Sequence, residues 1–92
     1  MEKKPDAAPL KVDFSTFVLS LATGAMIHLG IVPDPTTGKT HPEPELARQN
    51  IEILSLLHEK TKGNLTSEEA SLIENILTEV RLRYVDVNKP KT

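Results

Sequence analysis

A charge-free stretch near the amino end constrains this chain more than any other feature. Residues 14–29 read F-S-T-F-V-L-S-L-A-T-G-A-M-I-H-L and contain no Asp, Glu, Lys or Arg, although 26% of the whole chain is charged. A helix built from this segment carries apolar side chains on most of its circumference, so it must be covered. The cover is the rest of the chain, a second copy of the chain, or lipid.

Composition limits what can supply that cover. A chain of 92 residues forms one domain, and two Phe, one Tyr and no Trp leave it an aliphatic core. The lack of cysteine excludes disulfides, thiolate metal sites and cysteine nucleophiles, and it fits the cytoplasmic location that we expect. The opening M-E-K-K-P-D-A-A-P does not read as a secretory signal. A net charge of −2 and a pI near 5.9 provide no electrostatic footprint for nucleic acid.

Helical periodicity predicts a first helix over residues 14–29. Asp13 is a suitable N-cap, and Gly30 suits the end of the helix. One side of the helical wheel collects apolar residues, namely Phe14, Phe17, Val18, Leu21, Ala25 and Leu29. Small or polar residues lie opposite or to one side, namely Thr16, Ser20, Thr23 and Gly24, with Ile27 among them. Ser20 and Gly24 form a small-x-x-x-small pair, which either lets a neighbouring helix approach closely or simply faces solvent.

The next segment, residues 31–43, is a proline-rich connector. Its turn signals are Asp34-Pro35 and Thr37-Gly38. A connection of this length is long for two helices of a small domain. It is therefore either an ordered lid over the surface or a hinge that lets the first helix pack on another subunit.

Two further helices are predicted, over residues 44–62 and 67–84. Pro44 is tolerated in a first turn, and Gly63 is a stop signal. The second helix has an apolar stripe of Leu46, Asn50, Ile53 and Leu57, with Ala47, Ile51 and Leu54 beside it and Leu56 off it. A capping box of Thr66 and Glu69 starts the third helix. The third helix is expected to bury Leu72, Ile73, Ile76, Leu77, Val80 and Tyr84.

These elements predict an all-α fold of three helices. Because the K-G-N-L connection is short, helices 2 and 3 should form an antiparallel hairpin, with helix 1 packed across it. The helical domain then covers residues 13–85, between a flexible arm (residues 1–12) and a flexible tail (residues 86–92). The first two helices carry more apolar arc than this unit hides, so we expect self-association.

Several sequence blocks carry a resemblance to a known family. In order they are F-S-T-F-V-L-S-L-A, H-L-G, P-D-P-x-T-G-K, E-K-T-K-G-N-L-T and R-x-R-Y-V, spread over residues 13–86. This series resembles a small bacterial family catalogued as a domain of unknown function, number eighteen forty-four. The resemblance implies a short, mainly helical bacterial protein. It implies no reaction and supplies no catalytic residues.

No pattern in the chain indicates a catalytic site. Gly38-Lys39-Thr40 resembles the end of a P-loop, but Pro33 occupies the position of the first glycine and no buried strand precedes it. Asp34 has no partner acid, base or nucleophile in the sequence, and we expect it to bond nearby backbone N–H groups. The sequence therefore favours a protein that is not an enzyme.

Metal, basic and membrane sites are weakly indicated. The three histidines are His28, His41 and His58, and nothing in their spacing requires the fold to bring them together, so we expect no metal or cofactor. The last four cationic residues are Arg81, Arg83, Lys89 and Lys91, read as a solvated helix end or a contact for an acidic partner. Ser, Thr, Gly and His dilute residues 14–32 too much for a membrane span, which leaves peripheral lipid contact as the membrane alternative.

Two functions are proposed as hypotheses. The favoured one is a non-enzymatic protein–protein interaction module or accessory subunit, which self-associates, binds a larger protein partner, or does both. Its predicted interaction face comprises Phe14, Phe17, Val18, Leu21, Ala25, Ser20, Gly24 and Leu56. The alternative is a small-molecule, metal or membrane-contact protein that uses a pocket between helix 1 and the Pro33–Pro44 connector.

Overall fold

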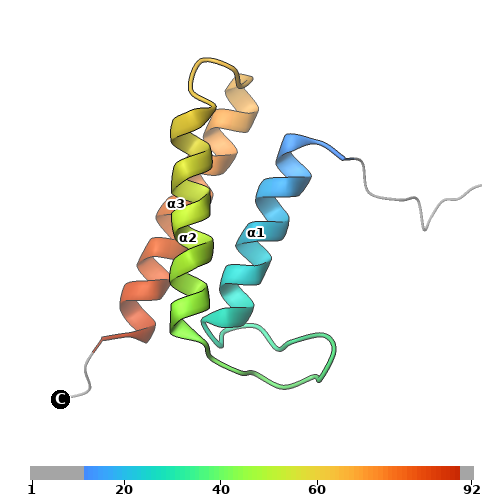
Figure 1. Cartoon of the computed structure of the whole chain (residues 1–92), viewed down its shortest axis with the longest axis vertical. Helices are drawn as coiled ribbons and strands as arrows, with labels where there is room; N and C mark the ends of the chain where they lie inside the picture. The colour runs from blue at the N-terminus through green and yellow to red at the C-terminus, as the bar shows by residue number, and fades with distance from the viewer. Residues whose placement is uncertain (1–11, 90–92) are drawn as a thin grey trace, which may run out of the picture.

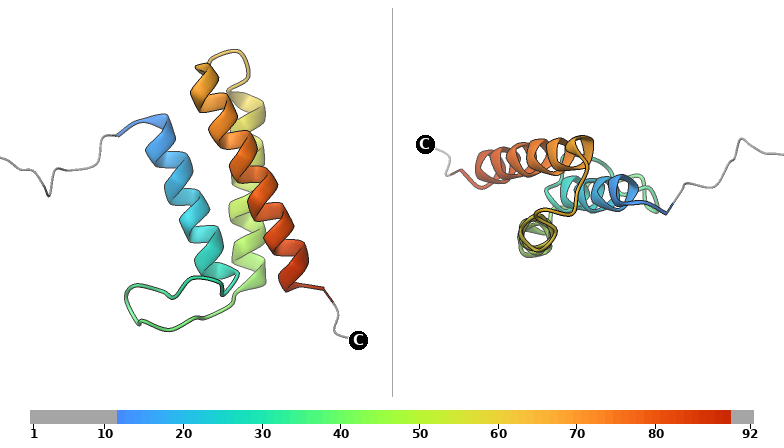
Figure 2. Two further views of the ribbon diagram at one scale, coloured as in Figure 1. Left: turned by 180° about the vertical axis from the view of Figure 1, so that it is seen from behind. Right: turned by 90° about the horizontal axis from the view of Figure 1, so that it is seen from above.

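Three helices make up the ordered domain. The structure is a computed structural model that describes residues 12–89, and in this range it has helices α1 (Phe14–His28), α2 (Pro44–Lys60) and α3 (Ser67–Val87) and no strand. α2 and α3 form an antiparallel hairpin, and α1 packs against both (Figure 1). Viewed along the bundle, the helices do not lie in one layer, because α2 is set to one side of α1 and α3 (Figure 2). The predicted all-α fold is confirmed.

Capping bonds begin α1 and α3 at the predicted residues. The Asp13 carboxylate accepts a hydrogen bond from the Thr16 amide at 2.8 Å. At the start of α3 the Thr66 hydroxyl accepts from the Glu69 amide at 3.1 Å, and the Glu69 carboxylate accepts from the Thr66 amide at 2.9 Å. These bonds satisfy N–H groups that have no partner inside the helix. The predicted N-cap and capping box are both confirmed.

The carboxyl ends of the helices differ from the prediction. α2 stops at Lys60, because the next residues already turn toward Gly63, whose φ is 84°. α3 continues to Val87, beyond the predicted end at residue 84, since nothing between Tyr84 and Pro90 breaks a helix. The predicted tail therefore starts too early. Most of the predicted arm (residues 1–11) and the end of the tail (residues 90–92) lie outside the described residues.

The core is aliphatic, as expected, and it takes in the predicted face of α1 except Phe17, but α2 is rotated relative to its predicted stripe. Its buried residues are Val18, Ala25, Leu29, Ala47, Ile51, Leu54, Ile73, Leu77 and Val80. The predicted inner stripes include Phe17, Leu46 and Ile53, yet all three are exposed. In α2 the smaller Ala47 occupies the contact in place of Leu46, which lets the helix axes approach, and the larger side chains lie at the edge.

The connector folds back onto the end of α1. The Glu43 amide donates to the His28 carbonyl at 2.6 Å, and a Cβ on Gly30, where φ is 81°, would lie 2.7 Å from Pro42. A tight turn closes the middle of the connector, where the Asp34 amide donates to the Lys39 carbonyl at 2.9 Å. The connector is thus attached to α1 at its carboxyl end, and Figure 1 shows it looping past the ends of α1 and α2.

Candidate functional site

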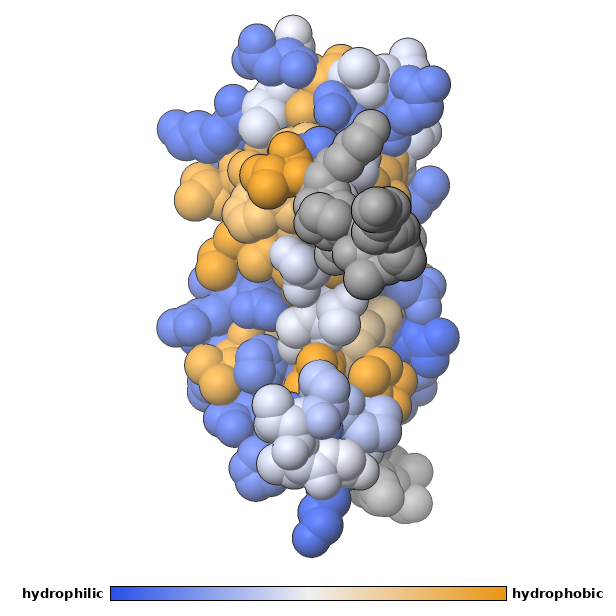
Figure 3. Space-filling view, turned by 90° about the vertical axis from the view of Figure 1, so that its right-hand side faces the viewer, coloured by the Kyte–Doolittle hydropathy of each residue, from blue (hydrophilic) through white to orange (hydrophobic). Residues whose placement is uncertain are grey.

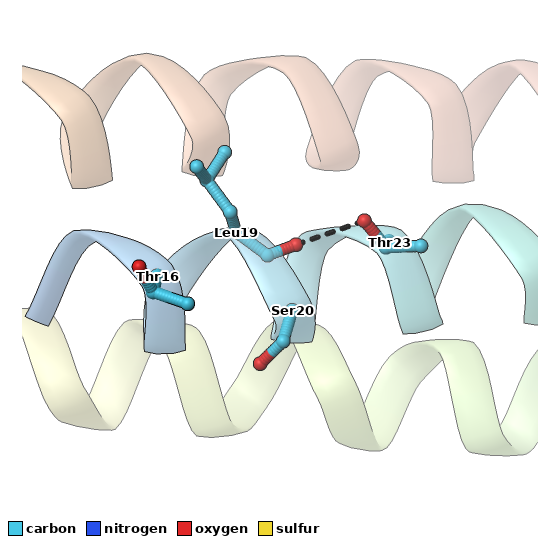
Figure 4. Close-up of a pocket in the computed structure, with 4 residues that line it drawn as sticks. All are labelled: Thr16, Leu19, Ser20 and Thr23. Carbon is cyan, nitrogen blue, oxygen red and sulfur yellow. Dashed lines mark hydrogen bonds between the residues drawn. The ribbon is translucent and has the colours of Figure 1, made fainter. Parts of the chain in front are cut away.

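The side of α1 that faces away from the hairpin has a shallow hollow. The hollow is lined by Thr16, Leu19, Ser20 and Thr23, which we name the outer face. At about 100° per residue these positions lie away from Val18 and Ala25, which point into the core. Leu19 points toward α3 and Ser20 toward α2, with Thr16 before them and Thr23 after them along the helix (Figure 4).

Two hydroxyl groups of the outer face are bonded within the helix. The Ser20 hydroxyl donates to the Phe17 carbonyl at 2.7 Å, and the Thr23 hydroxyl donates to the Leu19 carbonyl at 3.0 Å. A hydroxyl has one proton to donate, so neither group needs water for that purpose. Covering the outer face with protein therefore leaves these two donors satisfied and removes little hydration.

Large apolar side chains border the outer face. Phe17 and Leu19 of α1 are 49% and 50% exposed, and Ile53 of α2 is 44% exposed. Phe17 lies one turn before Leu21, whose carbonyl accepts a bond from α2, so it lies on the α2 side of α1. We name the outer face together with Phe17 and Ile53 the α1 surface. Figure 3 shows apolar side chains gathered on this side of the molecule, with charged ones toward its edges.

The predicted interaction face is divided by the fold. Val18 and Ala25 are fully buried in the core, and Phe14 and Leu21 pack against it. Phe17 and Ser20 belong to the α1 surface. Leu56 is exposed on α2, three residues after Ile53, so it extends the same apolar patch. A partner could therefore reach Phe17, Ser20 and Leu56 without unfolding the domain.

Gly24 is used inside the domain. A Cβ at this position would lie 2.7 Å from the Asn50 side-chain nitrogen of α2. Asn50 donates from that nitrogen to the Leu21 carbonyl at 3.2 Å. The small-x-x-x-small pair therefore has two separate roles, since Gly24 admits α2 and the exposed Ser20 lines the α2 side of the outer face (Figure 4).

Sequence reasoning missed four residues of the α1 surface. These are Thr16, Leu19, Thr23 and Ile53. A signal was available for the first three, because they lie opposite the apolar face in a helix without charge. Their neutrality, rather than their hydrophobicity, separates this surface from the other helix exteriors.

A second hollow lies in the connector. It is lined by Asp34, Thr37, Lys39, Thr40 and His41, all of which belong to the connector and not to α1. The Thr36 hydroxyl and amide donate to one Asp34 carboxylate oxygen at 2.7 and 2.9 Å. These two bonds, the hydroxyl bond first, hold the pKa of Asp34 below its usual value. The expected backbone bond is confirmed.

The elements on either side of the Gly38-Lys39-Thr40 turn do not match those of a P-loop. The helix after this turn begins at Pro44, whereas a P-loop requires a helix that starts at the lysine. The element before the connector is α1, not a strand. The turn therefore lacks both neighbours that a phosphate-binding loop needs.

The histidines lie in separate contacts. The imidazole of His41 is 3.7 Å from the Glu43 carboxylate, and that of His58 is 3.5 Å from the Glu74 carboxylate. His28 is at the end of α1. Across residues 12–89 there is no group of three or more His, Asp or Glu side chains placed to hold a metal ion.

The basic end of α3 is engaged within the molecule. Arg83 donates to the Glu79 carboxylate at 2.6 Å, and this bond raises the pKa of Arg83. Arg81 donates to the Ser55 hydroxyl at 3.1 Å. Lys89 is exposed, and Lys91 lies outside the described residues. These contacts leave less free positive charge at this end than the sequence suggested.

Comparison with known proteins identifies a family but no activity. In the part of the chain that the structure describes, no helix has the length and apolar character that crossing a membrane requires. Searches of curated proteins and of solved structures gave no match. A family model described as a domain of unknown function (DUF1844) matches residues 11–86, which is most of the chain. The protein therefore belongs to the DUF1844 family, as its sequence blocks predicted.

Proposed function

We propose that this protein is a non-enzymatic interaction module, an accessory subunit that docks on another protein chain through the α1 surface. One observation carries the proposal. The α1 surface is exposed and uncharged, and it includes the half-exposed side chains of Phe17, Leu19 and Ile53. Removing such side chains from water is the main favourable term when proteins associate.

The contrast with the exterior of α2 supports this choice. There, Arg48 donates to Glu45 at 2.9 Å and to Glu52 at 2.6 Å, as expected for a helix face that remains in water. Exposed pairs of this kind keep a surface hydrated and add little stability. The outer face of α1 has no charged side chain, so it is less strongly hydrated than the exterior of α2 and easier to cover with protein.

The small-molecule or metal alternative has less support. The residues that line the connector hollow belong to the connector and not to α1, and Asp34 already accepts two bonds from Thr36. The setting that we propose is the bacterial cytoplasm, on the family resemblance and the absence of cysteine.

Affinity capture with a matched pair of variants tests the proposal. Thr23 of the outer face and Thr78 of α3 are both exposed, and each hydroxyl bonds the carbonyl four residues earlier at 3.0 Å. Thr23→Arg places a charge on the α1 surface, and Thr78→Arg places the same charge on the hairpin. Wild type, Thr23→Arg and Thr78→Arg, each as tagged full-length protein, are captured from the native host, and what they bind is analysed by mass spectrometry.

The proposal expects a stoichiometric protein that is recovered with wild type and Thr78→Arg and lost with Thr23→Arg. Circular dichroism melts of both variants check that the fold is kept. Recovery that Thr23→Arg does not reduce would contradict a role for the α1 surface, and stoichiometric lipid, metal or metabolite would favour the alternative function.

A further inference from the structure

We infer that one occupant of the α1 surface is a second copy of this chain, with the two α1 helices packed antiparallel about a two-fold axis near Ser20 and Thr23. The inference rests on the proposed function, because it uses the same surface. It adds that a second copy of the chain binds this surface, and it gives the relative direction of the two α1 helices.

The charge pattern favours self-docking on this surface. A two-fold contact sets a surface against its own copy, so each charge near the axis meets a like charge. No residue from Phe14 to Ile27 carries charge, so two α1 surfaces meet without that repulsion. The exposed apolar end of α3 is a poorer choice, because Glu79 and Asp86, three residues before and four residues after Leu82, lie beside it on the helix surface.

The ends of α1 favour the antiparallel direction. In that arrangement the positive amino end of each helix dipole lies beside the negative carboxyl end of the other. A parallel arrangement would place two copies of the connector side by side, with the exposed Lys39 of one against that of the other. The midpoint of α1 is Leu21, so the outward residues nearest the axis are Ser20 and Thr23.

The available area is sufficient for a weak dimer. α1 has 15 residues, so it is about 22 Å long, and half of a cylinder about 11 Å wide gives roughly 400 Å². The flank of α2 with Ile53 and Leu56 adds roughly 200 Å². Two copies then bury roughly 1,200 Å², the lower limit for specific interfaces, so the dimer should be a weak one.

Sedimentation velocity on the full chain tests the association. Wild type should convert from monomer to dimer as its concentration rises to about 100 µM. Thr23→Arg should weaken the dimer by at least about tenfold, because the arginine is buried without a partner. Thr78→Arg should leave the dissociation constant within about twofold.

Single cysteines test the direction of packing, because the chain has no cysteine of its own. Under mild oxidation Ser20→Cys should cross-link to its copy, and Thr78→Cys should not. Thr16→Cys alone should cross-link poorly, since two copies of residue 16 are roughly 16 Å apart along antiparallel helices. A mixture of Thr16→Cys and Ile27→Cys should cross-link efficiently, because disulfides need Cα atoms about 4–7 Å apart.

Other outcomes would overturn the inference. Wild type that stays monomeric at about 100 µM, or a dimer that Thr23→Arg leaves intact, removes self-docking on this surface. Self-cross-linking of Thr16→Cys as efficient as that of Ser20→Cys removes the antiparallel arrangement. Neither result touches the proposed function, which stands or falls on whether capture of a different protein depends on Thr23.

Discussion

α1 and the α2–α3 hairpin share one core but are stabilised in different ways. The hairpin contains many contacts between residues near in sequence, such as the Thr66–Glu69 capping box and the Arg83–Glu79 pair. α1 has a capping bond at Asp13, but its charge-free length offers no ion pair. Its further stabilisation comes from contact with the hairpin, mainly the burial of Val18 and Ala25 and the Asn50 bond to the Leu21 carbonyl.

This difference separates folding from function on the two exteriors. A helix of 15 residues is marginal alone in water, so α1 depends on its packed face. Charged groups on its outer face would help α1 in the same way that they help α2, at no cost to the core. The neutrality of the outer face therefore has no explanation in the folding of one chain, and it is the reason that we assign docking to it.

The largest expected effect comes from the core that joins the two regions. Leu54 is fully buried against residues of α1 and α3, whereas Leu56, on the same helix, is 54% exposed. Leu54→Ala should lower the free energy of unfolding by about 2–5 kcal/mol, since it leaves a cavity. Leu56→Ala should change it by less than about 1 kcal/mol. Urea denaturation followed by circular dichroism measures both.

Equal losses of unfolding free energy in Leu54→Ala and Leu56→Ala would contradict the distinction between a buried core and an exposed patch. They would mean that Leu56 is buried in solution, most directly by a second chain. Repeating the Leu56→Ala measurement at low and high protein concentration separates that case from a repacked monomer, because only a dimer gives a stability that depends on concentration.

The starts of the helices were predictable because the physics of a helix cap is local. Asp13, Thr66 and Glu69 act on amides within three residues, so the sequence alone places their bonds. The early end assigned to α3 shows the limit, because no stop residue lies between Tyr84 and Pro90. The predicted hairpin followed from the short connection between α2 and α3 in the same local way.

The rotation of α2 about its axis and the exposed position of Phe17 at the edge of the α1 face could not be predicted. Phe17 and Val18 are neighbours on a broad apolar arc, and either could occupy its centre. Contact with two other helices selects Val18, because a smaller side chain lets the axes approach. The same choice moves Phe17 and Ile53 outward, so the candidate site is a consequence of tertiary packing.

A smaller effect distinguishes a hydroxyl that caps a helix from one that faces outward. Thr66→Ala should cost about 1 kcal/mol, because the Glu69 amide loses its acceptor at the start of α3. Thr23→Ala in α1 should be neutral or stabilise by a few tenths of a kcal/mol, since alanine has the higher helix propensity. Thermal and urea melts of both variants check the order. A clear loss for Thr23→Ala would show that the outer face contributes to stability.

The smallest effect lies in the connector and depends on pH. The Thr36 hydroxyl and amide bonds favour the ionised Asp34 carboxylate, so its pKa in the folded chain is below the ordinary 3.8. A lowered pKa in the folded state gives stability that is present above 3.8 and is lost as the pH falls through the folded pKa. Asp34→Asn removes this titration. The difference in free energy of unfolding between wild type and variant should therefore shrink as the pH falls through that window.

NMR titration of the Asp34 carboxyl measures the pKa directly, and Thr36→Val is the matched variant. Valine lacks the hydroxyl and keeps the backbone amide, so the pKa of Asp34 should rise toward 3.8 without reaching it. A wild-type midpoint at or above 3.8 would mean that the Thr36 bonds to the Asp34 carboxylate are not formed in solution. The connector would still be held to α1 at both ends, where the Ile31 amide bonds Met26 and the Glu43 amide bonds His28, so only its middle would move.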